Sequence, residues 1–508
     1  MSISPPRFRR IEGLVFVLAG ALCAASCTGP GRSGGNTGGS GTSGETGNGG
    51  NSGGSGSGGN VGATGGATGS GGVSLGTGGA GSGGRVSTGG TGGSSGSAGG
   101  AGSTGTGGAT GTGGASGGTG TGGAAGSGSG SGGAPLTIPG AGQCAAPAGA
   151  SVADATAAYN KWKSDLVVSD GARGFLRVRR PNSSGAVVNS SNSEGIAYGM
   201  LLAVYANDQN TFDNLWKYEQ LFPDNHGLMN WYISPDGNSV LGTGAATDAD
   251  EDMAFALIMA DKRWGGQGTL STTYLAAAKT LIGLIWQYEV DASRNHVLTS
   301  GDQSDGSVIN ISYFAPAYYR AFGRVANTAS NWKMVIDTSY TVITATLNAQ
   351  NGNTQNGLVP AWSTPAGVPM TPSGTSMPLY HQLDSCRTPF RLGQDYCWNA
   401  EQRALTYLQK LTGFYSGVGV ANMVDGYDLN GTPHPQFVTT GGPRAASFVG
   451  PAGVGAMATG TTYVKLRDDA YTSVATLTDL AGSTYYQESW TALSLQMMTG
   501  LLQDLEAP

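Results

Sequence analysis

From about residue 150 onward, the hydrophobic residues of this chain recur mainly at intervals of three and four, which is the period of an amphipathic helix. Met253, Ala256, Leu257 and Ala260, for example, fall on one helical face. Runs that alternate hydrophobic and polar residues between turns are few, so a sheet-based fold is not expected. The period predicts about twelve helices, at 152–166, 194–206, 211–221, 249–261, 271–289, 314–326, 330–348, 388–411, 414–424, 444–458, 464–477 and 484–501.

The segments between these helices are long in two places, 230–247 and 357–384, and both are rich in Gly, Pro, Asn and aromatic residues. Loops of this length in a compact domain usually carry function. Ser193 and Thr247 occupy positions that are typical of helix N-caps. Helices joined by long loops at one end fit a closed ring of helical hairpins, although the period does not by itself fix closure.

The pattern is different at the N-terminus, where three arginines precede a hydrophobic run at 13–25 and small residues follow it. This arrangement predicts an export signal over residues 1–27. The run has about 13 residues, whereas a membrane-spanning helix needs about 20. The tetrapeptide at 24–27 also resembles a bacterial lipobox, with Ala24 where such motifs usually have Leu. Cys27 is therefore the predicted lipidation site, and secretion without a lipid is the alternative.

Residues 28–140 consist almost entirely of Gly, Ser, Thr and Ala. Without large hydrophobic side chains, such a segment cannot bury enough surface to offset the entropy of ordering, so it is predicted to be a disordered linker. A flexible chain of this length reaches roughly 50 to 60 Å. That reach suits a domain held away from a cell surface, which makes the outer membrane or the cell exterior the expected location.

The remaining segment, 141–508, is long enough for one large domain. From residue 135 onward the chain holds 21 of the 26 basic and 30 of the 32 acidic residues, a formal balance of −9. Nucleic acids and anionic lipids need a basic surface, so neither is an expected partner. The protein is expected to be a monomer. On one continuous helix, Cys386 and Cys397 would lie about 16 Å apart. No disulfide framework is therefore expected, unless a loop separates the two cysteines.

The chain carries few charges, yet four acidic residues stand together in ATDADEDMAFAL, 246–257. A calcium loop that starts at Asp248 would need Gly at its sixth position and Glu at its twelfth, where this chain has Met253 and Met259. HExxH and P-loop motifs are absent from the sequence, and no Gly-x-Ser-x-Gly motif occurs in residues 141–508. Neither a metal nor a cofactor is therefore predicted. Acidic residues that complement a helix dipole are the simplest alternative.

Two further stretches carry carboxylates in settings that suit acid and base chemistry. In SEGIAYGM, 193–200, Glu194 starts a hydrophobic helix, and a carboxyl group in such surroundings tends to have a raised pKa, as a general acid needs. In YHQLDSCRTPFR, 380–391, Arg387 follows Asp384 closely and favours its ionised form, as a general base needs. The structural alternatives are a helix-start Glu and an Asp–Arg pair.

Taken together, these stretches resemble glycoside hydrolase family 8, bacterial enzymes that cleave β-1,4-linked polysaccharides. ATDADEDMAFALIMADKRW (246–264) follows the family signature. SEGIAYGM (193–200) and DSCRTPFR (384–391) resemble the segments that carry the family's general acid and general base. Weaker similarity is found in NISYFAPAYYRAF (310–322) and YYQESWTALSLQMMTG (485–500).

The resemblance implies an all-α fold, an (α/α)6 barrel of about twelve helices, over residues 141–508. It also implies Glu194 as the general acid, Asp384 as the general base and Asp248 as the residue that binds and orients the sugar. Tyr313 would help to position the attacking water, and Arg387 would steady Asp384. The family inverts the anomeric carbon, which requires the acid and base carboxyl groups to lie about 6.5 to 9.5 Å apart.

Sugar rings need flat hydrophobic platforms, and Trp231 and Trp362 on the two long loops are the predicted ones. Four tryptophans at helical spacing are assigned to the core: Trp264, Trp286, Trp332 and Trp490. The expected activity is that of an endo-β-1,4-glucanase. Xylan, mixed-linkage glucan and chitosan are alternative substrates, and a surface lipoprotein that binds polysaccharide without cleaving it is the alternative from another class.

Overall fold

The computed structural model describes residues 136–181, 186–375, 377–435, 446–476 and 485–507. The predicted export signal with Cys27 and the predicted linker up to residue 135 lie outside the described residues. Ile138 is buried in the hydrophobic core. The folded part of the chain therefore begins a few residues before residue 141.

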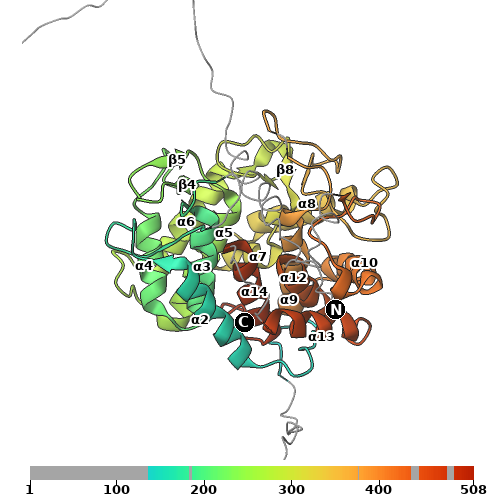
Figure 1. Cartoon of the computed structure of the whole chain (residues 1–508). Helices are drawn as coiled ribbons and strands as arrows, with labels where there is room; N and C mark the ends of the chain where they lie inside the picture. Colours follow the sequence, from blue (N-terminus) through green and yellow to red (C-terminus); the bar gives the residue numbers. More distant parts are fainter. Residues whose placement is uncertain (1–135, 182–185, 376, 436–445, 477–484, 508) are drawn as a thin grey trace, which may run out of the picture. The chain divides into compact units, whose positions relative to one another are not determined.

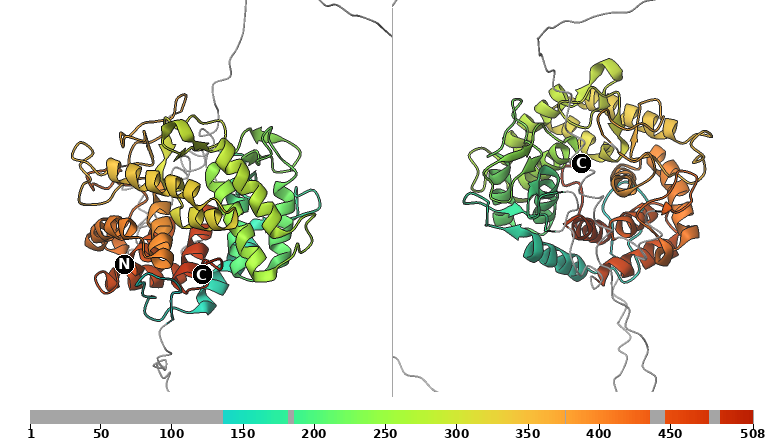
Figure 2. Two further views of the ribbon diagram at one scale, coloured as in Figure 1. Left: turned by 180° about the vertical axis from the view of Figure 1, so that it is seen from behind. Right: turned by 45° about the horizontal axis from the view of Figure 1, so that its top comes forward.

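Six helices form an inner ring in which each packs against the next, and the last packs against the first. Figure 2 shows the ring most clearly, and Figure 1 labels its members. The inner helices are α3 (Ser193–Tyr205), α5 (Thr247–Trp264), α7 (Pro316–Val325), α9 (Arg387–Asn399), α12 (Ala446–Met457) and α14 (Tyr485–Met498).

A second set of helices covers the inner ring from outside, and each of its members packs against one or two inner helices. The outer helices are α2 (Val152–Leu166), α4 (Gln209–Glu219), α6 (Tyr274–Tyr288), α8 (Ala329–Thr346), α10 (Gln402–Val418) and α13 (Val464–Ala475). Among the described residues, α2 is the first helix and α14 the last, and because the two pack against each other, the two ends of the fold close the ring together. This is the predicted (α/α)6 barrel, with twelve α-helices among the described residues.

The two sets of helices differ in how their hydrophobic residues are arranged. Every residue of α3 is buried, as expected of a helix that is surrounded on all sides. In α2 the buried residues instead recur along one stripe, at Ala155, Ala158, Tyr159, Trp162 and Leu166. A stripe of this kind buries one face and leaves the other to solvent, which suits an outer helix.

The predicted helix 388–411 is two helices, and the boundary between them lies at Ala400. Ala400 adopts a left-handed backbone with φ +55°. The last carbonyl groups of α9 accept hydrogen bonds from the N-terminal segment, Ala141 N to Trp398 O at 3.1 Å and Gly142 N to Cys397 O at 3.0 Å. The predicted helix 414–424 is also wrong, because α10 continues to Val418 and the short 3-10 helix η4 (Val420–Asn422) follows it.

Two predicted N-caps are each displaced by one residue. Asn192 caps α3, since its side chain accepts a hydrogen bond from Gly195 N at 3.1 Å, and Ser193 is already helical. Ala246 precedes α5, where Thr247 is the first helical residue. Both predictions are therefore wrong in position, although both helices begin where the sequence indicates.

Short antiparallel strands tie the connections together. They are β1 (Val167–Val168) with β2 (Arg177–Val178), β3 (Ser191–Asn192) with β4 (Tyr232–Ile233) and β5 (Val240–Gly242), β6 (Val290–Asp291) with β7 (Val297–Leu298), and β8 (Ile309–Asn310) with β9 (Trp362–Ser363). The 3-10 helices η1 (Ala292–Arg294), η2 (Ile311–Tyr313) and η3 (Leu383–Cys386) complete the connections. None of the helices described here is both long and hydrophobic enough to cross a membrane.

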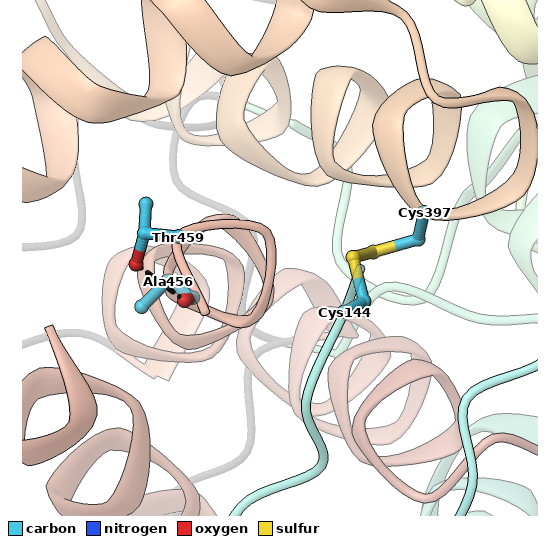
Figure 3. Close-up of a disulfide and its surroundings, with 4 residues drawn as sticks. All are labelled: Cys144, Cys397, Ala456 and Thr459. Atoms are coloured by element: carbon cyan, nitrogen blue, oxygen red, sulfur yellow. Dashed lines mark hydrogen bonds between the residues drawn. A yellow bond between two sulfur atoms is a disulfide. The ribbon is translucent and has the colours of Figure 1, made fainter. Parts of the chain in front are cut away.

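A disulfide joins Cys144 to Cys397, whose Cα atoms lie 5.4 Å apart. Figure 3 shows it linking the segment before α2 to the end of α9. The expectation of no disulfide framework is therefore wrong. That expectation rested on the pair Cys386 and Cys397. Cys386 lies at the start of α9 and Cys397 lies within it, and Cys386 is a free, buried thiol. The partner of Cys397 comes from 253 residues earlier in the chain, which no local spacing reveals.

Candidate active site

The predicted site residues meet where four inner helices begin. Glu194 and Asp248 are the second residues of α3 and α5. Tyr313 ends η2, just before α7, and Arg387 is the first residue of α9. A helix N-terminus carries a partial positive charge and unpaired N–H groups, so it favours carboxylates. The ring therefore places its acidic residues where the backbone field supports them.

Arg387 lies at the centre of this group and is almost completely buried. Its Nη1 donates to Glu194 Oε2 at 2.8 Å and to Asp248 Oδ2 at 2.6 Å. Its Nη2 lies 3.2 Å from Asp384 Oδ1. The guanidinium also stacks over the ring of Tyr313, 4.9 Å from its centroid. One planar cation thus holds three carboxyl groups that come from three different helix starts.

Glu194 is in the setting of a proton donor. Burial raises the pKa of its carboxyl group to about 8, against the opposing effect of Arg387 and with support from the charges of Asp248 and Asp384. Only 5% of the residue is exposed, and Oε1 is buried without a hydrogen-bond partner among the described residues. A carboxyl group with this pKa keeps its proton at neutral pH and can deliver it.

The other two carboxyl groups are held by donors. Asp248 Oδ1 accepts from Ala249 N at 3.0 Å, while burial raises the pKa of Asp248 and Arg387 opposes that rise. Asp384 lies in η3, and its Oδ2 accepts from Asn310 Nδ2 at 3.2 Å and from Gln382 Nε2 at 3.4 Å. These two donors hold the carboxyl group of Asp384 in one orientation, which suits a base.

The other acidic residues of the 246–257 stretch lie away from this group, and all are buried. Asp252 pairs with Arg391, one turn further along α9, at 2.6 Å. Glu251 accepts a hydrogen bond from Tyr319 Oη at 2.9 Å. Asp250 faces the buried carboxyl group of Glu289. Asp248 is therefore the member of the stretch that joins the candidate active site.

The two predicted tryptophan platforms are buried, Trp231 with 4% and Trp362 with 0% of its surface exposed. Trp362 packs edge-on against Tyr313, with ring centroids 6.4 Å apart, so it has no free face for a sugar and this prediction is wrong. The stacking role of Trp231 stays a prediction. The backbone of Trp231 helps to fix the start of α3, because Trp231 O accepts a hydrogen bond from Ser193 N, next to Glu194, at 2.9 Å.

Of the four tryptophans assigned to the core, Trp332 and Trp490 are buried. Trp264 and Trp286 are partly buried and pack against the core. All four therefore belong to the packed interior or its margin, as their spacing indicated.

Several polar residues at the site were not identified from the sequence. Ser312 Oγ accepts from Arg387 Nε at 2.9 Å, and Tyr198 Oη lies 3.4 Å from Arg387 Nη1. Asn310 and Gln382 donate to Asp384. Tyr198 could have been identified from its position in the sequence, because it follows Glu194 by one helical turn and lies on the same face of the helix. Asn310 and Ser312 lie within the weaker similarity at 310–322.

One group of described residues has the composition of a metal site, namely Asp224, His226 and Asp302, whose ligand atoms lie within 4.8 Å of one another. His226 Nδ1 contacts Asp302 Oδ2 at 2.6 Å, and Asp302 Oδ1 accepts from Ala245 N at 2.8 Å. Both contacts are hydrogen bonds of Asp302, one with the His226 ring and one with the Ala245 backbone. The second one fixes the backbone three residues before Asp248.

Comparison with known sequences agrees with this geometry. Residues 142–500 match the family Glycosyl hydrolases family 8. Endoglucanase C of Ruminiclostridium cellulolyticum is 36% identical over 352 residues, which cover 68% of this chain and 71% of that protein. Endoglucanase 2 of Ruminiclostridium josui is 37% identical over 353 residues, with 68% and 71% covered.

Among solved structures, the apo structure of a β-1,3-1,4-glucanase from Paenibacillus sp. X4 is similar to this chain, with a TM-score of 0.62 and 28% sequence identity. The similarity covers 72% of this chain and 96% of that one. The family match spans far more than half of the chain. This chain therefore belongs to glycosyl hydrolase family 8 and is a glycoside hydrolase.

Proposed function

We propose that this protein is an inverting endo-β-1,4-glucanase in which Glu194 is the general acid and Asp384 is the general base. The observation that carries the proposal is the contact of one buried guanidinium, that of Arg387, with three carboxyl groups. One positive charge neutralises one of three negative charges, so the group favours retention of a proton. The pKa of Glu194, about 8, identifies the carboxyl group that keeps it.

In the proposed reaction, Asp384 takes a proton from a water molecule while the water oxygen bonds to the anomeric carbon. The bond from that carbon to the glycosidic oxygen breaks, and Glu194 gives its proton to the leaving oxygen. Asp248 binds a hydroxyl group of the sugar being attacked and orients its ring, and Tyr313 helps to position the water. Attack from the face opposite the leaving group inverts the anomeric configuration.

The names of the relatives support a β-glucan as the substrate. Two of them are endoglucanases, and one relative of solved structure is a β-1,3-1,4-glucanase. We propose internal β-1,4 linkages of cellulose or of soluble β-1,4-glucan as the sites of cleavage. Mixed-linkage glucan, xylan and chitosan are the other substrates to compare.

The proposal is tested by incubating the purified protein with carboxymethylcellulose, mixed-linkage β-glucan, xylan and chitosan, and by measuring reducing ends and product lengths. Carboxymethylcellulose should give the fastest release, with long products first. Glu194→Gln and Asp384→Asn should each lower kcat at least about 100-fold, because acid–base catalysis contributes that much or more. Binding without release of reducing ends, or full activity in both variants, would refute the enzyme assignment of these residues.

We also propose that the enzyme acts outside the cytoplasm, held to the cell surface through a lipid on Cys27. The hydrophobic run at 13–25 and the lipobox-like tetrapeptide at 24–27 support this location. The Cys144–Cys397 disulfide supports it independently, since such bonds persist in oxidising compartments. Mass spectrometry of the mature N-terminus tests the lipid, and Cys27→Ser should release the protein into the medium.

A further inference from the structure

Asn310, the last residue of β8, is buried, and its side-chain amide is fixed at both ends. Its Oδ1 accepts from Ser312 N at 3.0 Å and from Ser312 Oγ at 2.7 Å. Its Nδ2 donates to Asp384 Oδ2 at 3.2 Å. Because two donors occupy Oδ1, the amide cannot turn over, and its N–H must point at Asp384.

The contacts continue from Ser312 to Arg387 and return to Asp384. Ser312 Oγ, which donates to Asn310, accepts from Arg387 Nε at 2.9 Å. Arg387 Nη2 then lies 3.2 Å from Asp384 Oδ1. The four residues form a closed ring of polar contacts, and every member is buried.

The ring supplies a donor to each oxygen of Asp384, Arg387 to Oδ1 and Asn310 to Oδ2. A donor on each oxygen fixes the plane of the carboxylate. A general base needs a fixed orientation, since it must aim one lone pair at the attacking water.

We propose that Asn310 and Ser312 are positioning residues for the general base, acting through Asp384 and Arg387 without touching the substrate. This inference rests on the proposed role of Asp384. Asn310 orients the carboxylate directly. Ser312 holds the amide of Asn310 and the guanidinium of Arg387 in the orientations that the ring requires.

Asn310→Asp provides the sharpest test, because it keeps the shape of the side chain and the acceptor for Ser312. It replaces the donor to Asp384 with a second carboxyl group, which competes with Asp384 for protons. The acid limb of the kcat/KM profile should move up by about one pH unit or more, and kcat at neutral pH should fall at least about tenfold. KM should stay within about threefold of the parent value, since no substrate contact changes.

Asn353→Asp is the matched control. Asn353 is fully buried and its amide also has both ends bound, donating to the carbonyl oxygens of Thr346 and Leu358 and accepting from Asn348 N. Its contacts lie at the end of α8 and within the loop that follows it, rather than at the site. Asn353→Asp should lower the melting temperature and leave the pH profile in place.

Ser312→Ala is the second variant, in case Asn310→Asp does not fold. It should lower kcat at least about fivefold at an unchanged KM, and Ser312→Thr, which keeps the hydroxyl group, should recover most of the loss. An unmoved acid limb in Asn310→Asp, together with parental kcat in Ser312→Ala, would overturn the inference. If Asp384→Asn is also fully active, the proposed function fails with it; if Asp384→Asn is inactive, the positioning role alone fails.

Discussion

Arg387 Nη1 donates to Glu194 Oε2 at 2.8 Å, from the first residue of α9 to the second residue of α3. An arginine beside a carboxyl group normally lowers its pKa. Here burial is the larger effect, and the pKa of Glu194 is raised to about 8. The contact therefore aligns a proton donor without removing its proton.

Arg387→Lys tests the geometry of this contact separately from its charge. Lysine keeps the positive charge, but its compact ammonium cannot bridge three carboxyl groups as the planar guanidinium does. We expect kcat to fall at least about tenfold. Arg391→Lys is the control, because Arg391 pairs with Asp252 one turn further along α9. It should lower stability and leave kcat nearly unchanged; equal losses of kcat in the two variants would argue against a special role for Arg387.

The pKa of Glu194 sets the alkaline limit of activity. A general acid works only while it is protonated, so kcat/KM should fall as pH rises through about 8. The measurement is a kcat/KM profile from pH 5 to about 10 on a soluble glucan, with the folded state checked by circular dichroism at each pH. An alkaline limb near the ordinary pKa of a glutamate would contradict the assignment of Glu194.

Glu289 should make the fold less stable at alkaline pH. Burial raises its pKa from 4.5 to about 8, so between these values the folded state holds a proton that the unfolded state has released. The contribution of Glu289 to the free energy of unfolding is therefore fully present below about pH 4.5 and is lost as the pH rises to about 8. Glu289→Gln removes the titration, and urea unfolding should show a gain on the order of 3 kcal/mol at pH 8 to 9 relative to pH 4.5.

Glu401→Gln is the contrasting control for Glu289→Gln. The hydrogen bond from Arg403 lowers the pKa of Glu401 to about 2, so its contribution to stability is present above the unfolded pKa. Its removal should cost stability at neutral and alkaline pH. A stability difference between Glu289→Gln and the parent that does not change with pH would contradict the linkage.

The Cys144–Cys397 disulfide closes a loop of 253 residues. Cross-links over long loops restrict the unfolded chain strongly, and their removal typically costs about 2 to 4 kcal/mol. Adding reductant to the parent protein should lower its melting temperature, and so should Cys144→Ala. Adding reductant to Cys144→Ala should lower the melting temperature no further. Cys386→Ala should stay as sensitive to reductant as the parent, because Cys386 is a free thiol. If reductant does not change the melting temperature of the parent protein, the disulfide has no stabilising role.

The helices and the central carboxyl groups were predictable because their signals are local, whereas closure into a barrel was implied only by the family resemblance. Helical periodicity marks the helices, and Glu194, Asp248 and Asp384 each stand in a recognisable stretch at a helix start. Arg387 was expected to steady Asp384 alone. Its contacts with Glu194 and Asp248 depend on the meeting of three helix ends, which no single stretch encodes.

What the sequence did not reveal depends on packing between distant segments. The break at Ala400 coincides with backbone hydrogen bonds that α9 accepts from residues 141 and 142. Cys144 reaches Cys397 through the same docked segment. Trp362 stands on a long loop, where exposure was a reasonable expectation, yet the loop folds back and buries it against Tyr313.

If Glu194 and Asp384 act on opposite faces of one β-glycosidic bond, the enzyme must invert the anomeric carbon. Proton NMR of the first product released from cellopentaose, recorded before the anomers equilibrate, distinguishes inversion from retention. The new reducing end should appear first as the α-anomer, since water attacks opposite the leaving group. A product that appears first as the β-anomer would show retention and refute the assigned roles of Glu194 and Asp384.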